Sequence, residues 1–293
     1  MSRKQKGLLV AGLVILALIS AGLAIRHMDI PVLEPAGPVA QKERGLIITA
    51  FLLSMIVVIP VYVILVWFSL KYRHTNKSAK YDPGFSHSRW LEGVWWAVPL
   101  SIISILAVIA FKSSHDLDPF KPLASTNPTL KIQVVSMEWK WLFIYPDQGI
   151  ASVNYVNFPV NTPVDFEITS DAPMNSFWIP QLGGQIYAMS GMSTSMNLMA
   201  DKLGTYRGLS ANISGDGFAG MHFAAVASTP SNYSKWLDSV RNSPKQLDSQ
   251  SYEELAKPTM NDPPAYYALA QPGLFDSILS KYAEPVFKSG SGQ

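Results

Sequence analysis

Residues 45–70, GLIITAFLLSMIVVIPVYVILVWFSL, form an apolar run of 26 residues without a single charge. As an α-helix, this run would be about 39 Å long at about 1.5 Å per residue, which is enough to cross a bilayer with some tilt. A second apolar run, GVWWAVPLSIISILAVIAF, occupies residues 93–111. Each run contains a proline, which membrane helices tolerate because neighbouring groups can satisfy the freed backbone atoms. The two runs predict a transmembrane helical hairpin over residues 45–111.

The loop between the two runs, residues 71–89, indicates the direction of the hairpin. It carries one acidic residue, Asp82, against the basic residues Lys71, Arg73, Lys77, Lys80 and Arg89. Short loops rich in lysine and arginine stay on the cytoplasmic side of a membrane. We therefore expect a multi-pass protein of the bacterial cytoplasmic (inner) membrane, with residues after 112 in the periplasm of a Gram-negative host.

Residues 1–26 resemble a targeting segment, because Arg3, Lys4 and Lys6 precede the apolar run GLLVAGLVILALISAGLAI. Gly22 and Ala24 place small residues where a signal peptidase cleaves, so a signal peptide is one reading. The run is also long enough to remain as a signal anchor and third span. Residues 27–44 follow as a short outer segment rich in proline.

The composition limits the class of protein. Of the 293 residues, 48% are hydrophobic and the net charge is +2, which suits a membrane anchor with one globular domain and gives no indication of nucleic-acid binding. There are no cysteines. Their absence excludes disulfides, a lipid-modified N-terminal cysteine and any metal site that needs a thiolate.

The rest of the chain changes character twice. Residues 112–128 hold three prolines and predict a linker. Residues 129–228 contain short runs rich in β-branched and aromatic residues, separated by Pro, Gly, Asn and Asp, which is typical of a Greek-key β-sandwich or barrel. Residues 229–293 carry helix formers behind Ser and Asn caps, which predicts an aromatic-rich helical extension. Its aromatic residues are expected to pack on the β domain: Tyr266, Tyr267, Phe275, Tyr282 and Phe287.

Glu92 is an acid at the start of the second apolar run, and two interpretations are open. A carboxylate at a helix end can stay ionised at headgroup level, beside Arg89 and within a belt formed by Trp90, Trp95 and Trp96. Alternatively, it could load protons from the cytoplasm into a path through a partner subunit.

Several stretches of the chain resemble, in order, subunit II of the haem–copper respiratory oxidases over roughly residues 45–227. These are HSRWLEGVWWAVP (87–99), MEWKW (137–141), FPVNTPVDFEITS (158–170), APMNSFWIP (172–180), IYAMSGM (186–192) and GTYRGLSANISGDGFAGMHF (204–223). The resemblance implies a cupredoxin-like fold for the β domain. It also implies that Glu92 lies at the mouth of a lysine-type proton channel.

The chain departs from the copper-bearing branch of that family at the copper ligands. The branch has an early His and a late loop of the form C-S-E-x-C-G-x-x-H-x-x-M. Aligned with one extra residue, the ligand positions in this chain are Asn175, Leu209, Ala211, Ser214, Phe218 and Met221. Only the methionine is retained, and a thioether alone cannot bridge two coppers. We therefore expect a cupredoxin-like domain without metal, and an adjacent His222 that is not a ligand.

Loss of the copper ligands resembles the quinol oxidase branch, the cytochrome bo and ba types. The resemblance implies a subunit without its own redox centre in a proton-pumping ubiquinol oxidase, with the haems and copper in subunit I. The implied partners are oxidase subunits I, III and IV, the lipid bilayer, and ubiquinol as substrate of the complex; cytochrome c is not expected as a partner. Trp139 and Trp141, which resemble an electron-accepting strand of the copper-bearing branch, are interpreted as core and interface aromatics.

Two other functions stay open on the sequence. One is a cytochrome c oxidase subunit II with a degenerate copper site. The other is a free-standing, membrane-anchored protein that handles copper, with Cu(I) held by the soft thioethers of Met189, Met192, Met196 and Met199. Methionine is also a common filler of irregular cores.

Overall fold

The computed structural model of the protein describes residues 20, 22–23, 30–78, 84, 87–269 and 271–282. The question of a cleaved or retained N-terminal segment over 1–26 falls almost wholly outside these residues. So do Phe287 and part of the loop over 71–89, including Lys80 and Asp82.

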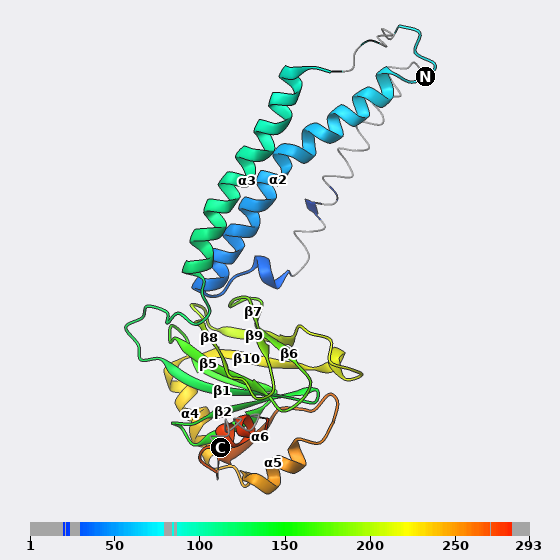
Figure 1. Ribbon diagram of the computed structural model, residues 1–293. Helices are drawn as coiled ribbons and strands as arrows, with labels where there is room; N and C mark the ends of the chain where they lie inside the picture. The colour runs from blue at the N-terminus through cyan, green and yellow to red at the C-terminus, as the bar shows by residue number, and fades with distance from the viewer. Residues whose placement is uncertain are drawn as a thin grey trace, which may run out of the picture.

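The two apolar runs form a helical hairpin, as predicted. Helix α2 spans Pro38–Lys71 and helix α3 spans Arg89–Asp116, and both are long and apolar enough to cross a membrane. None of their most apolar surface is buried within this chain, so lipid or another protein must cover it. Figure 1 shows both helices standing on the β domain, with the end of α2 and the start of α3 farthest from it.

The helix boundaries differ from those expected from hydropathy alone. Helix α2 begins at Pro38 and not at residue 45, so the outer segment 27–44 is partly helical. Pro38 occupies the first turn, where its missing N–H costs nothing. Helix α3 likewise continues past residue 111 to Asp116, which shortens the linker expected over 112–128. In both cases, the helix is longer than its apolar run: polar residues precede the run in α2 and follow it in α3.

The start of α2 is fixed to the β domain by backbone hydrogen bonds. The N–H of Ala36 donates to the carbonyl of Gln181 at 2.8 Å, and the carbonyl of Ala36 accepts from the N–H of Asp201 at 2.8 Å. Gly37 lies so close to the domain that an added Cβ would be 2.1 Å from the carbonyl oxygen of Met199. The hairpin and the β domain are therefore joined through main-chain contacts at this point, in addition to the linker.

The β domain consists of two sheets packed face to face. The seven-stranded sheet has the order β11-β12-β3-β2-β1-β5-β8, and the five-stranded sheet has the order β4-β10-β9-β6-β7. The parallel pairs β1–β5 and β10–β4 require crossovers between the sheets, so the expected Greek-key sandwich is confirmed. The strands are β1 Leu130–Met137, β2 Lys140–Tyr145, β3 Ile150–Val153, β4 Tyr155–Pro159, β5 Val164–Ser170, β6 Asn175–Trp178, β7 Gln185–Ala188, β8 Thr194–Leu198, β9 Gly204–Ser210, β10 His222–Ser228, β11 Gln246–Leu247 and β12 Ala265–Leu269.

Aromatic side chains fill the space between the sheets. Trp141 is fully buried and meets Phe177 and Phe223 edge-on, with ring centroids 5.5 and 5.9 Å apart. Phe177 and Phe223 stack on each other at 5.2 Å. Such aromatic pairs add to the stabilisation that comes from burial itself. The interpretation of Trp141 as a core residue is confirmed.

The C-terminal extension differs from the expected helical segment. Helices α4 (Pro230–Arg241), α5 (Ser249–Leu255) and α6 (Leu274–Lys281) are present, but Tyr266 and Tyr267 lie in strand β12. This strand pairs with β3 and lengthens the seven-stranded sheet. The helical prediction for AYYAL was therefore wrong: a free sheet edge offers this β-prone stretch hydrogen bonds that a short isolated helix cannot match.

The extension also builds a second apolar core on the outer face of the larger sheet. Phe275 and Ile278 of α6, with Tyr252 of α5, pack against strand residues such as Leu142 and Ile144. Both faces of this sheet are therefore covered. The expected packing of Phe275 on the β domain is confirmed.

Candidate functional site

A buried polar cluster lies where the sequence places the lost copper ligands. At its centre, Asn175 at the start of β6 is 1% exposed. Its Nδ2 donates to the Oγ of Ser214 at 3.0 Å and contacts the Sδ of Met221 at 3.1 Å. Its Oδ1 accepts from the Ser210 hydroxyl and from the N–H of Ser176. The amide thereby uses both its donor and acceptor groups within the cluster, as a buried polar group must.

Trp139 covers this cluster from the side of the β1–β2 turn. Its indole N–H donates to the carbonyl oxygen of Ser214 at 3.2 Å, and its backbone adopts the left-handed region at φ 63°. Its ring lies against Gly217, where an added Cβ would be 2.3 Å from the indole Cδ2. A side chain at position 217 would therefore displace the ring, which explains why glycine stands there.

The structure brings together three of the residues expected at lost ligand positions, namely Asn175, Ser214 and Met221. Leu209 is not among them, because it precedes the buried Ser210 in β9 and successive residues of a strand face opposite sides. Ala211 contributes only a backbone N–H, which donates to Ser176, and Phe218 lies in the short helix η2 (Phe218–Gly220). His222 is exposed at the start of β10.

Ser210 completes the cluster and was missed by the sequence reasoning. The signal was present: residues 210, 214, 218 and 221 reproduce the spacing of C-S-E-x-C-G-x-x-H-x-x-M without an extra residue. On this alignment, Ser210 replaces Leu209 at the first thiolate position, and Asn212 replaces Ala211 at the position of the glutamate. The side-chain geometry favours this register, because Ser210 contacts Asn175 and Leu209 does not.

The donor set of this cluster does not fit a dinuclear copper centre. It consists of one amide, two hydroxyls and one thioether, whereas bridging copper requires thiolate sulfur. Within the described part of the chain, no group of three or more His, Cys, Asp or Glu residues could hold a metal ion. The four methionines considered for Cu(I) do not share one environment, since Met196 is 3% exposed in the core and Met192 is 55% exposed.

Glu92 lies in the first turn of α3, at the end of the hairpin remote from the β domain. Its Oε1 is 2.6 Å from the Nδ1 of His87, and both side chains are more than half exposed in this chain alone. Ser88 caps the start of the helix, and its side chain accepts from the N–H of Leu91. The sequence reasoning did not identify His87, although an imidazole five residues before a candidate proton-loading acid is a readable signal.

The C-terminal extension clamps the loop that leads into β6. The carboxylate of Asp171 accepts from the Lys281 ammonium at 2.7 Å and from the hydroxyls of Tyr282 and Tyr252 at 2.5 and 2.7 Å. Burial alone would raise the pKa of Asp171, but these three donors outweigh it and hold the pKa below its ordinary value. The extension is thus tied to the loop that immediately precedes Asn175.

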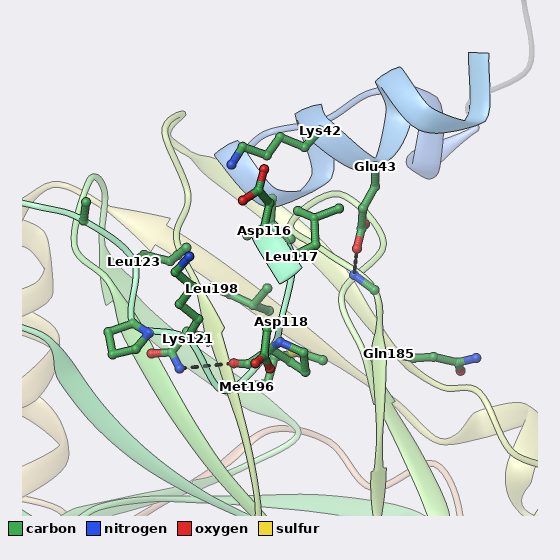
Figure 2. A pocket seen from close by; sticks show the side chains of 16 residues that line it. Lys42, Glu43, Asp116, Leu117, Asp118, Lys121, Leu123, Gln185, Met196 and Leu198 are labelled. Carbon is green, nitrogen blue, oxygen red and sulfur yellow. Dashed lines mark hydrogen bonds between the residues drawn. The ribbon is translucent and has the colours of Figure 1, made fainter. Parts of the chain in front are cut away.

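A cavity of about 320 Å³ lies at the junction between the hairpin and the β domain. It is lined by the start of α2, the end of α3 and the segment that follows it, and by β7 and β8. Figure 2 shows Lys42, Asp116, Asp118 and Lys121 around it, with Glu43 bonded to the N–H of Gly184 at 2.9 Å. The sequence reasoning did not predict this cavity, because it forms only where segments far apart in the chain meet.

Comparisons with known proteins agree with these features. The COX Aromatic Rich Motif matches residues 241–286, which cover most of the C-terminal extension. The periplasmic domain of subunit II of cytochrome oxidase from Bradyrhizobium japonicum aligns with 41% of this chain and 96% of that domain, at 22% identity and a TM-score of 0.38, which is too low to carry an argument.

Sequence relatives give the decisive comparison. The chain is 49% identical to cytochrome bo(3) ubiquinol oxidase subunit 2 of Pseudomonas aeruginosa, over 90% of this chain and 80% of that protein. It is 46% identical to ubiquinol oxidase subunit 2 of Acetobacter aceti, over 95% and 91% of the two chains. Quinol oxidase subunit 2 of Bacillus cereus is 38% identical over 78% of each chain. With this identity over most of the chain, the protein belongs to the subunit 2 family of the ubiquinol oxidases.

Proposed function

We propose that this membrane-anchored chain is the second subunit of a proton-pumping terminal ubiquinol oxidase of the bacterial inner membrane, with its β domain in the periplasm. It would hold no redox centre of its own. The haems, the active-site copper and oxygen reduction would belong to subunit I. Subunits III and IV would complete the complex; the relative from Pseudomonas aeruginosa is named as subunit 2 of its oxidase.

The observation that carries this proposal is the self-satisfied polar cluster around Asn175. Its amide and hydroxyl groups bond to one another, so the site is closed by hydrogen bonds and offers no thiolate. A subunit without an electron relay on its outer face has no use for a soluble electron donor. Electrons would therefore come from ubiquinol inside the membrane, and cytochrome c would not be a partner.

The hairpin supports the structural part of this role. Its apolar side chains are exposed along both helices within this chain, including Phe51, Ile59, Leu65, Ile103 and Phe111. Subunit I would cover one side of the hairpin and lipid the other. The backbone bonds between the start of α2 and the β domain would then hold that domain over the outer face of the complex.

The one chemical step of this subunit would be proton uptake from the cytoplasm, carried out by Glu92 together with His87. An imidazole can take a proton from the cytoplasm and pass it across the 2.6 Å contact to the carboxylate. Glu92 would then release the proton into a path through subunit I. The exposure of both side chains at the cytoplasmic end of α3 suits exchange with solvent.

The test is to purify the tagged protein from its native membrane in mild detergent and to measure haem spectra, metal content and oxygen uptake. The proposal predicts co-purified haem, uptake driven by ubiquinol and not by reduced cytochrome c, and no copper beyond the active-site ion. A haem-free preparation with copper on this chain would contradict it and favour a copper-handling protein. Uptake driven by cytochrome c would instead favour a degenerate cytochrome c oxidase subunit.

The role of Glu92 has its own test in the same preparation. Glu92→Gln should slow turnover and haem reduction by about 100-fold, the lower end of what a positioned proton-transfer group contributes. Glu253→Gln, which neutralises an exposed carboxyl on α5, is the matched control and should change neither rate. Unchanged rates in Glu92→Gln would sink the proton-loading role but leave the assignment to a ubiquinol oxidase intact.

A further inference from the structure

The junction cavity lies at the depth of lipid headgroups. Lys42 precedes the apolar run of α2 by one turn, which places its backbone about 4.5 Å beyond the apolar part, and Asp116 lies about 7.5 Å beyond the apolar run of α3. The headgroup layer on each side of a bilayer is about 5–8 Å thick. The cavity is therefore next to the headgroups of the outer leaflet when the hairpin spans the membrane.

The charges around the cavity are mixed and mostly unpaired. Two cations, Lys42 and Lys121, face three anions, Glu43, Asp116 and Asp118, which gives a net charge of −1. Glu43 is held by the N–H of Gly184. Within the described residues, the side chains of Lys42, Asp116 and Lys121 make no hydrogen bond or ion pair, so both signs of charge remain available to a ligand.

The walls between these charges are apolar. Leu117, Leu123 and Leu198 line the cavity, and the exposed apolar runs of α2 and α3 begin within one to two turns of the helix residues that line it. A volume of about 320 Å³ lies within the range of ligand pockets, and an apolar wall with a few polar groups is their usual lining. The combination suits an amphiphile whose head carries both charges.

We propose that this cavity binds the headgroup of a phospholipid that has a phosphodiester and a primary ammonium, as in phosphatidylethanolamine. The phosphate would face Lys42 and Lys121, and the ammonium would donate to Asp116 and Asp118. The acyl chains would run along the apolar sides of α2 and α3. Such a lipid would join hairpin, linker and β domain at one point, as a third connection between membrane and periplasmic parts.

The charge balance discriminates between lipids. An anionic headgroup such as phosphoglycerol would meet three carboxylates without offering an ammonium. A choline headgroup has a positive charge but no N–H to donate to Asp116 or Asp118. Charge-assisted hydrogen bonds are the stronger kind, so the primary ammonium should be preferred.

The test is a lipid titration of the delipidated protein, purified with any subunits that accompany it and followed by native mass spectrometry. Phosphatidylethanolamine should bind at least about ten-fold more tightly than phosphatidylglycerol or phosphatidylcholine with the same acyl chains. Asp116→Asn with Asp118→Asn should weaken its binding at least about ten-fold, because the loss of even one charge-assisted contact is worth that factor and this variant removes two. The control Asp147→Asn with Glu253→Gln removes two exposed carboxyls elsewhere and should leave binding unchanged.

A second double variant, Lys42→Gln with Lys121→Gln, keeps the proposal testable if the first one misfolds. It should weaken the binding of phosphatidylethanolamine by a similar factor. Soluble glycerophosphoethanolamine should compete only weakly, because it lacks the acyl chains; displacement at equal concentration would show that a free headgroup is the true ligand and would overturn the lipid assignment. Equal binding of phosphatidylglycerol, or unchanged binding in both variants, would overturn the site. This inference depends on the hairpin spanning the membrane and not on the oxidase assignment. A preference for phosphatidylethanolamine in a preparation without haem would therefore support the lipid site and contradict the proposed function.

Discussion

Lys140 offers the sharpest test of how the C-terminal extension is held. The side chain is 2% exposed, yet it carries a charge. Its Nζ donates to the carbonyls of Leu255 and Lys257 at 2.9 and 3.0 Å and to the hydroxyl of Thr259, and it lies 3.1 Å from the carboxylate of Asp262. One ammonium in strand β2 thus binds four groups of the extension.

The change Lys140→Met keeps the length and apolar stem of the side chain but removes every one of these bonds. Removing one partner of a buried pair typically costs about 3–5 kcal/mol, because the other partner is left unsatisfied. Asp262 is 28% exposed and can recover some hydration, so we expect the lower end, about 3 kcal/mol. The substitution should lower the free energy of opening of the extension over 255–269, and not the free energy of unfolding of the whole sandwich.

Hydrogen exchange followed by mass spectrometry measures this opening in the full chain. A loss of about 3 kcal/mol corresponds to about 100-fold faster exchange in β12, with strand β5 unchanged. Lys245→Met, an exposed lysine in the same extension, is the matched control and should have no effect. Exchange less than about five-fold faster in Lys140→Met would refute the reasoning, because the four contacts would then contribute almost nothing.

Two further predictions concern the surroundings of the polar cluster. Gly217→Ala would place a Cβ 2.3 Å from the Trp139 ring, so it should cost about 1–3 kcal/mol of unfolding free energy and shift the tryptophan fluorescence to the red; unchanged emission would contradict the contact. Because the pKa of Asp171 is lowered on folding, its stabilising contribution is present above the ordinary value of 3.8 and is lost as the pH falls below it. Proteolysis of the tail should therefore accelerate below about pH 4 in the native chain and be fast at any pH in Asp171→Asn, and a tail equally protected at pH 3 and pH 7 would argue against the clamp.

The membrane hairpin and the type of outer domain were readable from the sequence, because both depend on patterns within short stretches. A run of 26 apolar residues can only be buried in lipid or protein, and alternating β-branched residues between turns can only build sheets. The absence of cysteine likewise excluded a thiolate copper centre without any coordinates. Chemistry that depends on residue type alone needs no tertiary information.

The sequence-based predictions of element type and helix boundaries failed where a segment is stabilised by contacts with a distant part of the chain. The stretch AYYAL forms strand β12 because β3 offers it an open edge, and residues 265–269 alone do not indicate that such an edge is available. Helix α2 starts at Pro38 because Ala40 is buried against the domain, while hydropathy places the boundary at 45. Local propensity is a weak determinant when tertiary contacts supply the free energy.

For the polar cluster, the sequence determined which chemistry was possible, and the tertiary structure decided which residues take part. Asn175 and Met221 were predicted from the motif. The ungapped motif spacing also points to Ser210, and the inward-facing side of β9 decides for Ser210 over Leu209. Successive residues of a strand point to opposite faces, so an error of one position exchanges a buried hydroxyl for an outward leucine. The same holds for the junction cavity, whose charges come from segments more than 70 positions apart and meet only because the chain folds back on its own membrane helices.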